Sequence, residues 1–150
     1  MPKVFFWRVG AVVPALGWIS PHPAPPHSRA IVMASRFDLK SLSDVPRFLV
    51  KSLVSWKQVK AAPGAYGASL VAQPLRRVFY TLSAWEDRNA LYAYAKSDPH
   101  GEVMRALRPR CRVSTFVFWE TGSADLPIGW DEAERRLAEQ ARLDAEGRAV

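Results

Sequence analysis

The sequence predicts an α+β domain in which strands and helices follow one another as β-α-β-β-α-β, with one more helix at the C-terminus. Runs of alternating large apolar residues predict the strands, and apolar residues at three- and four-residue steps between these runs predict the helices. The chain has 150 residues, of which 49% are hydrophobic, enough for one domain with a substantial core.

Residues 30–39 are predicted to form the first strand, with Met33 and Ser35 on one face and Ala34 and Arg36 on the other. Residues 43–62 are predicted to form the first helix, since Ser43 or Asp44 is a suitable cap and Pro63-Gly64 ends it. Its apolar side consists of residues at helical spacing, namely Val45, Phe48, Leu49, Ser52, Leu53, Trp56 and Val59.

Residues 66–73 and 78–86 are predicted to be the second and third strands, and the short turn between them makes them antiparallel. Asp87 then caps a second helix that ends near Lys96, and Pro99 begins a short further helix that ends at Pro109. His100 therefore stands in the first turn of that helix.

Residues 111–120 are predicted to form the fourth strand. Both of its faces are apolar, which favours a place inside the sheet. A last helix follows from Asp131, and we expect Trp130 and Leu137 to dock it.

This order is the ferredoxin-like plan, an antiparallel sheet with its helices on one side. We expect residues 29–121 to form this domain and residues 122–150 to add a turn and a helix. The other side of the sheet carries large residues, and a second copy of the same sheet is its simplest cover. A homodimer forming an α/β barrel is therefore expected.

Residues 1–28 are interpreted as an apolar, proline-rich extension before the domain. Arg8 and Pro14 interrupt its apolar part, so no membrane span is expected. A cytoplasmic location is expected, and the alternative is that residues 1–28 contain a signal-like segment. His22 and His27 lie in the proline-rich part and are expected to be exposed, because two histidines make a weak metal site.

The formal net charge is +7, much of it in an arginine-rich segment. Its members are Arg105, Arg108, Arg110 and Arg112, with Arg76 and Arg77 as a second pair. This charge would favour an acidic partner, or it is simply a solvated surface. Nucleic acid is disfavoured because the glycine-aromatic strand motif of RNA-recognition domains is missing. Cys111 is the single cysteine, so the chain has no internal disulfide, and no metal-ligand motif is found.

The stretch TLSAWEDRNALYAYAKSDPH, residues 81–100, and MASRF, residues 33–37, resemble the dimeric α/β-barrel superfamily. That superfamily includes antibiotic-biosynthesis and haem-degrading monooxygenases. The likeness is greatest to a bacterial family related to spheroidene monooxygenase, many of whose members have no assigned function. It covers residues 30–130.

The resemblance implies a ligand site between the helices and the sheet of each subunit, with haem as one candidate cofactor and no cofactor as the other. Haem-degrading members use an asparagine, a tryptophan and a histidine at places that hold Ser35, Tyr94 and Met104 here. This departure argues against haem degradation, whereas haem binding through His100 stays open.

His100 is the leading catalytic candidate, because a neutral imidazole in a pocket binds iron or moves a proton. A helix-capping or solvent-exposed histidine is the alternative. Arg36 would hold an anionic group such as a propionate, or else form a salt bridge. The other candidate ligand contacts are apolar or aromatic residues that could equally be core: Met33, Phe48, Tyr80, Trp85 and Trp119.

Together these features predict a monooxygenase-like protein that binds a hydrophobic or aromatic small molecule. The alternative is a non-catalytic binding or stress-related barrel whose arginine-rich segment docks an acidic partner.

Overall fold

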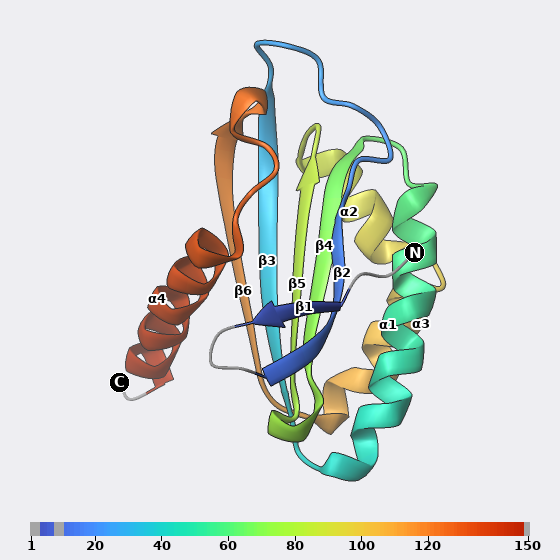
Figure 1. Cartoon of the computed structure of the whole chain (residues 1–150), viewed down its shortest axis with the longest axis vertical. Coiled ribbons are helices and arrows are strands. Elements are labelled where there is room, and N and C mark those ends of the chain that lie inside the picture. The colour runs from blue at the N-terminus through green and yellow to red at the C-terminus, as the bar shows by residue number, and fades with distance from the viewer. Residues whose placement is uncertain (1–3, 8–10, 149–150) are drawn as a thin grey trace.

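The computed structural model describes residues 4–7 and 11–148. Its central part contains the predicted elements in the predicted order: β3 (Arg29–Leu39), α1 (Val45–Lys60), β4 (Ala65–Gln73), β5 (Val78–Trp85), α2 (Arg88–Lys96), α3 (His100–Leu107) and β6 (Cys111–Gly122). Two strands precede them, β1 (Val4–Trp7) and β2 (Ala11–Ile19), and α4 (Trp130–Arg148) follows. Figure 1 shows the sheet with α1, α2 and α3 together on one side.

The strands are antiparallel throughout and lie in the order β1-β2-β4-β5-β3-β6. The four strands β4-β5-β3-β6 reproduce the ferredoxin-like order, and the fold class predicted from the sequence is thereby confirmed. The predicted place of the fourth strand is wrong, because β6 is an edge strand. The two apolar faces of β6 differ in burial. Trp119 is buried on one face, whereas Phe116 and Phe118 on the other remain more than a third exposed.

The N-terminal segment is part of the sheet rather than only an extension before it. β2 pairs with β4, with Ala15 opposite Val71 and Leu16 opposite Leu70. Trp18 packs directly on Gly67, where any side chain would collide with its ring. Residues 20–28 then cross to β3 without regular structure, as the prolines predicted, and both of their histidines are exposed. The predictions for residues 1–3 and 8–10 lie outside the described residues.

The helix boundaries follow from local chemistry. Asp87 caps α2 as predicted, accepting a hydrogen bond from the backbone N–H of Ala90 at 2.8 Å. α1 begins at Val45, later than predicted, because residues 42–44 form a separate 3-10 turn before it. Asp44 stands at the N-cap position but makes no side-chain cap bond, and its carboxylate accepts a hydrogen bond from Arg110 at 2.9 Å instead. Of the predicted apolar side of α1, Leu53 is exposed (52%). The helix therefore packs through a narrower stripe than its sequence indicated.

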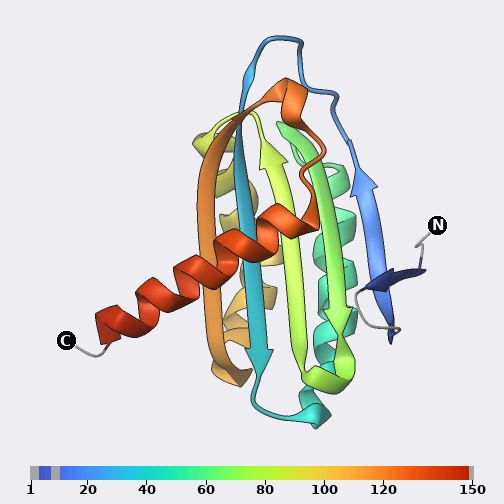
Figure 2. The ribbon, with the colours of Figure 1, turned by 60° about the vertical axis from the view of Figure 1, so that its left-hand side comes forward.

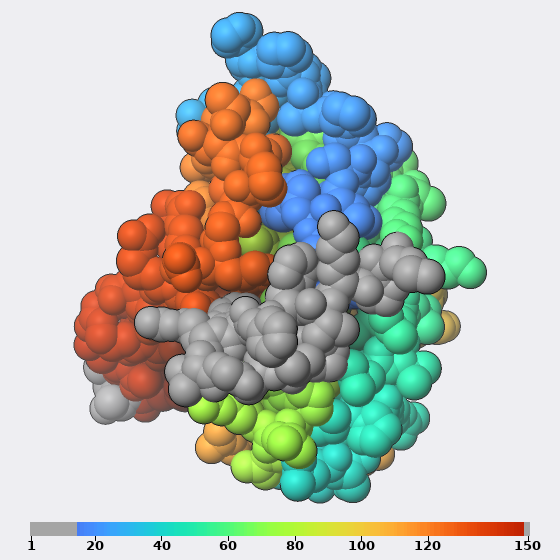
Figure 3. Space-filling view, viewed as in Figure 1, coloured from blue at the N-terminus to red at the C-terminus, as the bar shows by residue number. Residues whose placement is uncertain are grey.

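The two faces of the sheet are covered by different parts of the chain. The face that carries Ser35 and Thr81, here called the inner face, lies beneath α1, α2 and α3. The opposite face, here called the outer face, lies beneath α4 and the segment before it, with Ile128, Ala133 and Leu137 in one cluster with Val32, Tyr80 and Trp119. Figure 2 shows α4 crossing this face. In the space-filling view, α4 covers one side of the face and residues 15–28 another (Figure 3).

The outer face of the sheet is covered by the same chain rather than by a second copy. The large outer-face residues were expected to need a second copy of the sheet, yet Tyr80 and Trp119 are buried within a single chain. Trp130 contributes to the cover, since its indole N–H donates to the Ser69 hydroxyl at 3.1 Å. Burial of these residues therefore gives no reason to expect a dimeric barrel. Among the described residues, no helix has the length and apolar character needed to cross a bilayer.

Candidate functional site

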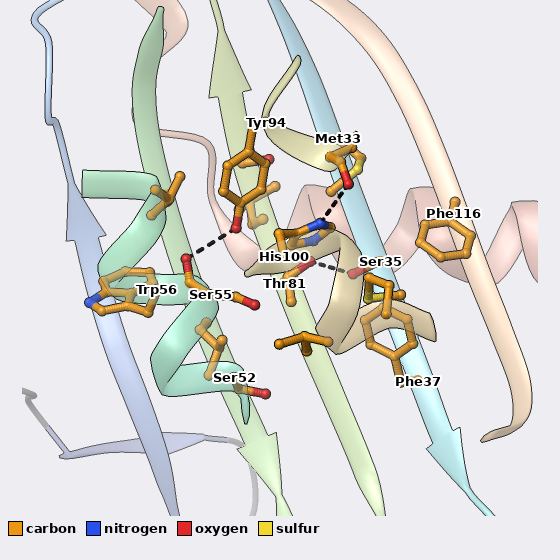
Figure 4. A pocket seen from close by; sticks show the side chains of 18 of the residues that line it. Met33, Ser35, Phe37, Ser52, Ser55, Trp56, Thr81, Tyr94, His100 and Phe116 are labelled. Carbon is orange, nitrogen blue, oxygen red and sulfur yellow. Dashed lines mark hydrogen bonds between the residues drawn. The ribbon is translucent and has the colours of Figure 1, made fainter. Parts of the chain in front are cut away.

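A pocket of about 300 Å³ lies between the inner face of the sheet and the three helices above it. Its floor comes from β3, β5 and β6, which contribute Met33, Ser35, Thr81 and Phe116, and α1 closes one side with Phe48 and Trp56. Figure 4 shows His100 from α3 and Tyr94 from α2 above this floor. Most of the lining is apolar, and the volume is at the small end of the range for ligand sites.

His100 is the first residue of α3 and lines the pocket. Its Nδ1 lies 3.1 Å from the carbonyl oxygen of Ala95. Because a carbonyl only accepts, this contact assigns the proton of the neutral ring to Nδ1 and leaves the lone pair on Nε2. Burial lowers the pKa of His100, an effect that the Ala95 carbonyl opposes. The ring is therefore neutral at pH 7, and its Nε2 has no partner among the described residues.

Gln58 on α1 holds the start of α3 in place. Its Oε1 accepts a hydrogen bond from the backbone N–H of His100 at 2.7 Å, and its Nε2 donates to the Ser97 hydroxyl at 2.7 Å. The first N–H groups of a helix have no partner within that helix, so this side chain supplies one from a neighbouring element. Sequence reasoning missed Gln58, since no pattern shows which glutamine of a helix faces the end of another.

Tyr94 connects His100 to the core. Its ring packs against the His100 ring at a centroid distance of 4.6 Å and against the Trp85 ring at 5.0 Å. The Tyr94 hydroxyl donates to the carbonyl oxygen of Ser55 at 3.1 Å, and burial strongly raises the pKa of this phenol. Tyr94 is therefore a fixed, neutral wall of the pocket rather than an acid or base.

Two hydroxyl groups lie side by side on the floor. Ser35 on β3 and Thr81 on β5 are directly opposite in the strand register, and their hydroxyls are hydrogen bonded to each other. Such a pair uses one of its two protons internally, so that one O–H stays free to donate. The pocket thus combines an acceptor at His100 Nε2 with a hydroxyl donor on its floor.

The structure brings together only part of the predicted site. Met33, Phe48 and His100 line the pocket, whereas Trp85 lies behind Tyr94, fully buried. Ser83, a further pocket residue, accepts the indole N–H of Trp85 at 2.9 Å. Trp85 therefore supports the wall instead of contacting a ligand.

Arg36, Tyr80 and Trp119 were expected at the same site but lie on the outer face. Successive residues of a strand point to opposite faces, and these three have the parity of Ala34 rather than of Ser35. The Arg36 guanidinium donates to Asp38 at 2.9 Å and lies over the Tyr80 ring. Trp119 lies beneath the guanidinium of Arg136 in α4. The sheet itself separates all three from His100.

Arg108 joins the pocket instead, at the residue that follows α3. The sequence placed it only in the arginine-rich segment, where nothing distinguished it from its neighbours. No group of three potential metal-ligating side chains occurs among the described residues.

Comparison with solved structures supports this fold. No protein-family model matches the chain, and no curated protein matches it either. A protein from Nitrosomonas europaea assigned to the antibiotic biosynthesis monooxygenases has a TM-score of 0.57 at 13% identity, over 71% of this chain and 98% of that one.

Two further structures are similar over most of the domain. A mutant form of SnoaB, a cofactor-independent oxygenase from Streptomyces nogalater, has a TM-score of 0.53 at 16% identity, over 65% of this chain and 97% of that one. LmHde, a heme-degrading enzyme from Listeria monocytogenes, has a TM-score of 0.55 at 16% identity, over 75% of this chain and 72% of that one. At such identities the likeness establishes the fold, the ferredoxin-like fold of these monooxygenases.

Proposed function

We propose that this chain is a monooxygenase-like protein that holds a hydrophobic or aromatic small molecule in the inner-face pocket. One observation carries the proposal: a neutral histidine presents a free ring nitrogen in an otherwise largely apolar pocket between sheet and helices. A polar group without a protein partner in such a place is available to a ligand. The fold shared with SnoaB and LmHde supports oxygen chemistry as the class of reaction.

In this proposal His100 acts as a general base. Its Nε2 accepts a proton from a hydroxyl or an acidic C–H of the ligand, and the Ala95 carbonyl stabilises the ring that has gained the proton. The resulting electron-rich anion reacts with oxygen. For an activated CH₂ group the reaction balances as R₂CH₂ + O₂ → R₂C=O + H₂O, and it consumes no external reductant.

Haem fits this site only in part. The free Nε2 of His100 is the type of donor that binds haem iron, and Arg108 could pair with a propionate. Against this, Tyr94 is held by Ser55 and Trp85, and Met104 stands where the resemblance to haem-degrading proteins asks for a histidine. No step of the proposed reaction runs through haem, and haem binding is an outcome of the test.

The test is oxygen uptake by the purified chain with a panel of phenols and reduced polycyclic aromatics, together with an absorption spectrum with and without haemin. We expect His100→Gln to abolish uptake and His27→Gln, in the exposed linker, to leave it unchanged. Uptake that survives His100→Gln would remove this residue from the mechanism. A Soret shift that disappears with His100→Gln would select haem as a cofactor.

Binding without any oxygen uptake would favour the non-catalytic alternative. Homodimer formation, a cytoplasmic location and kinship with the spheroidene monooxygenase-like family also stay predictions. Sedimentation equilibrium at micromolar concentration tests the first of these: a single species of 16.8 kDa would contradict it.

A further inference from the structure

From the charges around the pocket we infer that its ligand is an organic anion, an apolar body that carries a carboxylate or similar group paired with Arg108. This inference rests on the proposed function and specifies the class of molecule that the same pocket takes. It also replaces the anion contact expected of Arg36, which lies on the other face of the sheet.

The lining of the pocket carries charge of one sign. Among the described residues that line the pocket, Arg108 is the one lysine or arginine, and no aspartate or glutamate is among them. The other polar side-chain groups are hydroxyls, the indole N–H of Trp56 and the neutral imidazole of His100. Arg108 therefore carries the one formal charge among the described residues of the lining, and that charge is positive.

The arginines on either side of Arg108 have acidic partners. Arg105 pairs with Asp98 at 3.4 Å, Arg110 with Asp44 at 2.9 Å, and Arg112 approaches Asp38 to 3.9 Å. Arg108 has no ion pair with any described residue. Between Arg105 and Arg112 the other three arginines each have a carboxylate nearby, and the unpaired arginine, Arg108, is the one at the pocket.

The exposure of Arg108 to water determines which end of the ligand carries the charge. Its side chain is exposed, so a carboxylate beside it keeps part of its hydration. Burial of a charge deep in the pocket, beside Phe48, would cost far more free energy. An anionic ligand is thus expected to place its apolar part inside the pocket and its charged group beside Arg108.

The separation of His100 and Arg108 limits the form of the ligand. His100 begins α3 and Arg108 follows its last residue, so their Cα atoms are about 12 Å apart along the helix axis. A ligand that reaches both would carry a hydroxyl at one end and an anionic group at the other, with an apolar ring system between them. A hydroxynaphthoate has this form.

The experiment is calorimetric titration of the full chain with 6-hydroxy-2-naphthoate and with its uncharged amide. We expect the naphthoate to bind more tightly, by about fivefold to tenfold, as for a charge-assisted hydrogen bond at a partly hydrated site. Arg108→Gln should remove this advantage, and Arg108→Glu should reverse it. Arg105→Gln, in α3 three residues before Arg108 but outside the pocket, is the matched control and should preserve it.

Equal binding of the two probes to the native chain would overturn the inference, and so would an advantage that survives Arg108→Gln or is lost equally in Arg105→Gln. If both probes still bind and Ser52→Phe, which fills the pocket, abolishes that binding, the proposed pocket stands and only the anion contact fails. If neither probe binds the native chain, both the inference and the proposed pocket fail together.

Discussion

The two faces of the sheet differ in what lies above their small residues. On the outer face, Gly67 and Ser69 are each covered by a tryptophan of the same chain, Trp18 and Trp130. On the inner face, Ser35 and Thr81 have no large residue packed into the space above them, and that space is the pocket. Small residues therefore have opposite consequences on the two faces: one face uses them to admit its own side chains, the other to admit a ligand.

The comparison gives a physical criterion for a site in this fold. Both faces are apolar and both carry aromatic residues, so hydrophobicity alone does not distinguish them. The faces differ in whether the chain supplies a cover that fills the gaps. α4 and Trp18 of β2 fill them on the outer face, whereas α1, α2 and α3 span the inner face and leave about 300 Å³ beneath them.

The largest expected effect comes from removing the cover of the outer face. Leu137→Ala should destabilise the protein by about 2–4 kcal/mol, because this 2% exposed side chain leaves a cavity between α4 and the sheet. Urea denaturation followed by circular dichroism measures the change. Leu143→Ala, on the same helix but 47% exposed, should cost less than about 0.5 kcal/mol. Equal costs would mean that α4 does not cover the sheet.

A second prediction concerns the close contact at Gly67. Gly67→Ala should destabilise by about 1–3 kcal/mol, since the new methyl group collides with the Trp18 ring and β2 must move. Gly129→Ala is the control, because nothing lies within 4 Å of the added atom. Thermal unfolding of both variants provides the measurement, and a stable Gly67→Ala variant would show that Trp18 packs elsewhere.

A third prediction tests the opposite behaviour on the inner face. Thr81→Val keeps the shape of the side chain but removes its hydroxyl, so the Ser35 hydroxyl loses its partner. We expect a cost of about 1 kcal/mol in stability and weaker binding of 6-hydroxy-2-naphthoate. Denaturation and calorimetry of the same variant separate the two effects. Unchanged ligand affinity would exclude the hydroxyl pair from the site.

The smallest expected effect is a pH dependence from His100. Burial lowers the pKa of this side chain in the folded protein relative to the 6.5 of a free side chain, so the unfolded chain binds the proton more readily. Stability should therefore fall as the pH drops below about 6.5 toward the pKa of the folded protein. Denaturation at several pH values should show a shallower fall for His100→Gln. Identical pH profiles for the native chain and this variant would mean that burial does not affect the ring.

Most of the fold could be predicted from the sequence because its signals are local. Asp87 stands where a helix needs a cap, and the alternation in residues 78–86 assigns every residue of β5 to its observed face. Two features required tertiary information. β6 was predicted to be an interior strand because the sequence of the strand does not show that α4, the next helix, buries Trp119. Residues 11–19 were predicted to be an extension because the pairing of β2 with β4 leaves no local pattern in the sequence.

The site was less predictable than the fold for a related reason. Met33 and Phe48 were found because strand and helix periodicity places them between the sheet and the helices. His100 was found because it is the one histidine of the predicted domain and begins a helix. Arg36, Tyr80 and Trp119 were included for their residue types and their places in the strands, Arg36 because it interrupts an apolar face. Their strand parity nevertheless assigns them to the face opposite Ser35. Gln58 and Arg108 depend on how α1 and α3 meet, which no single segment of the sequence encodes.

The central claim is that the inner face binds ligands and the outer face does not, and nuclear magnetic resonance of labelled side chains tests it most directly. Met33, Met104 and Trp56 line the pocket, whereas Trp119 and Trp130 lie on the outer face. On titration with 6-hydroxy-2-naphthoate we predict shifts of the two methionine methyl signals and of the Trp56 indole, with the outer-face indoles unchanged. Shifts confined to Trp119 and Trp130, or no shifts at saturating probe, would contradict the account.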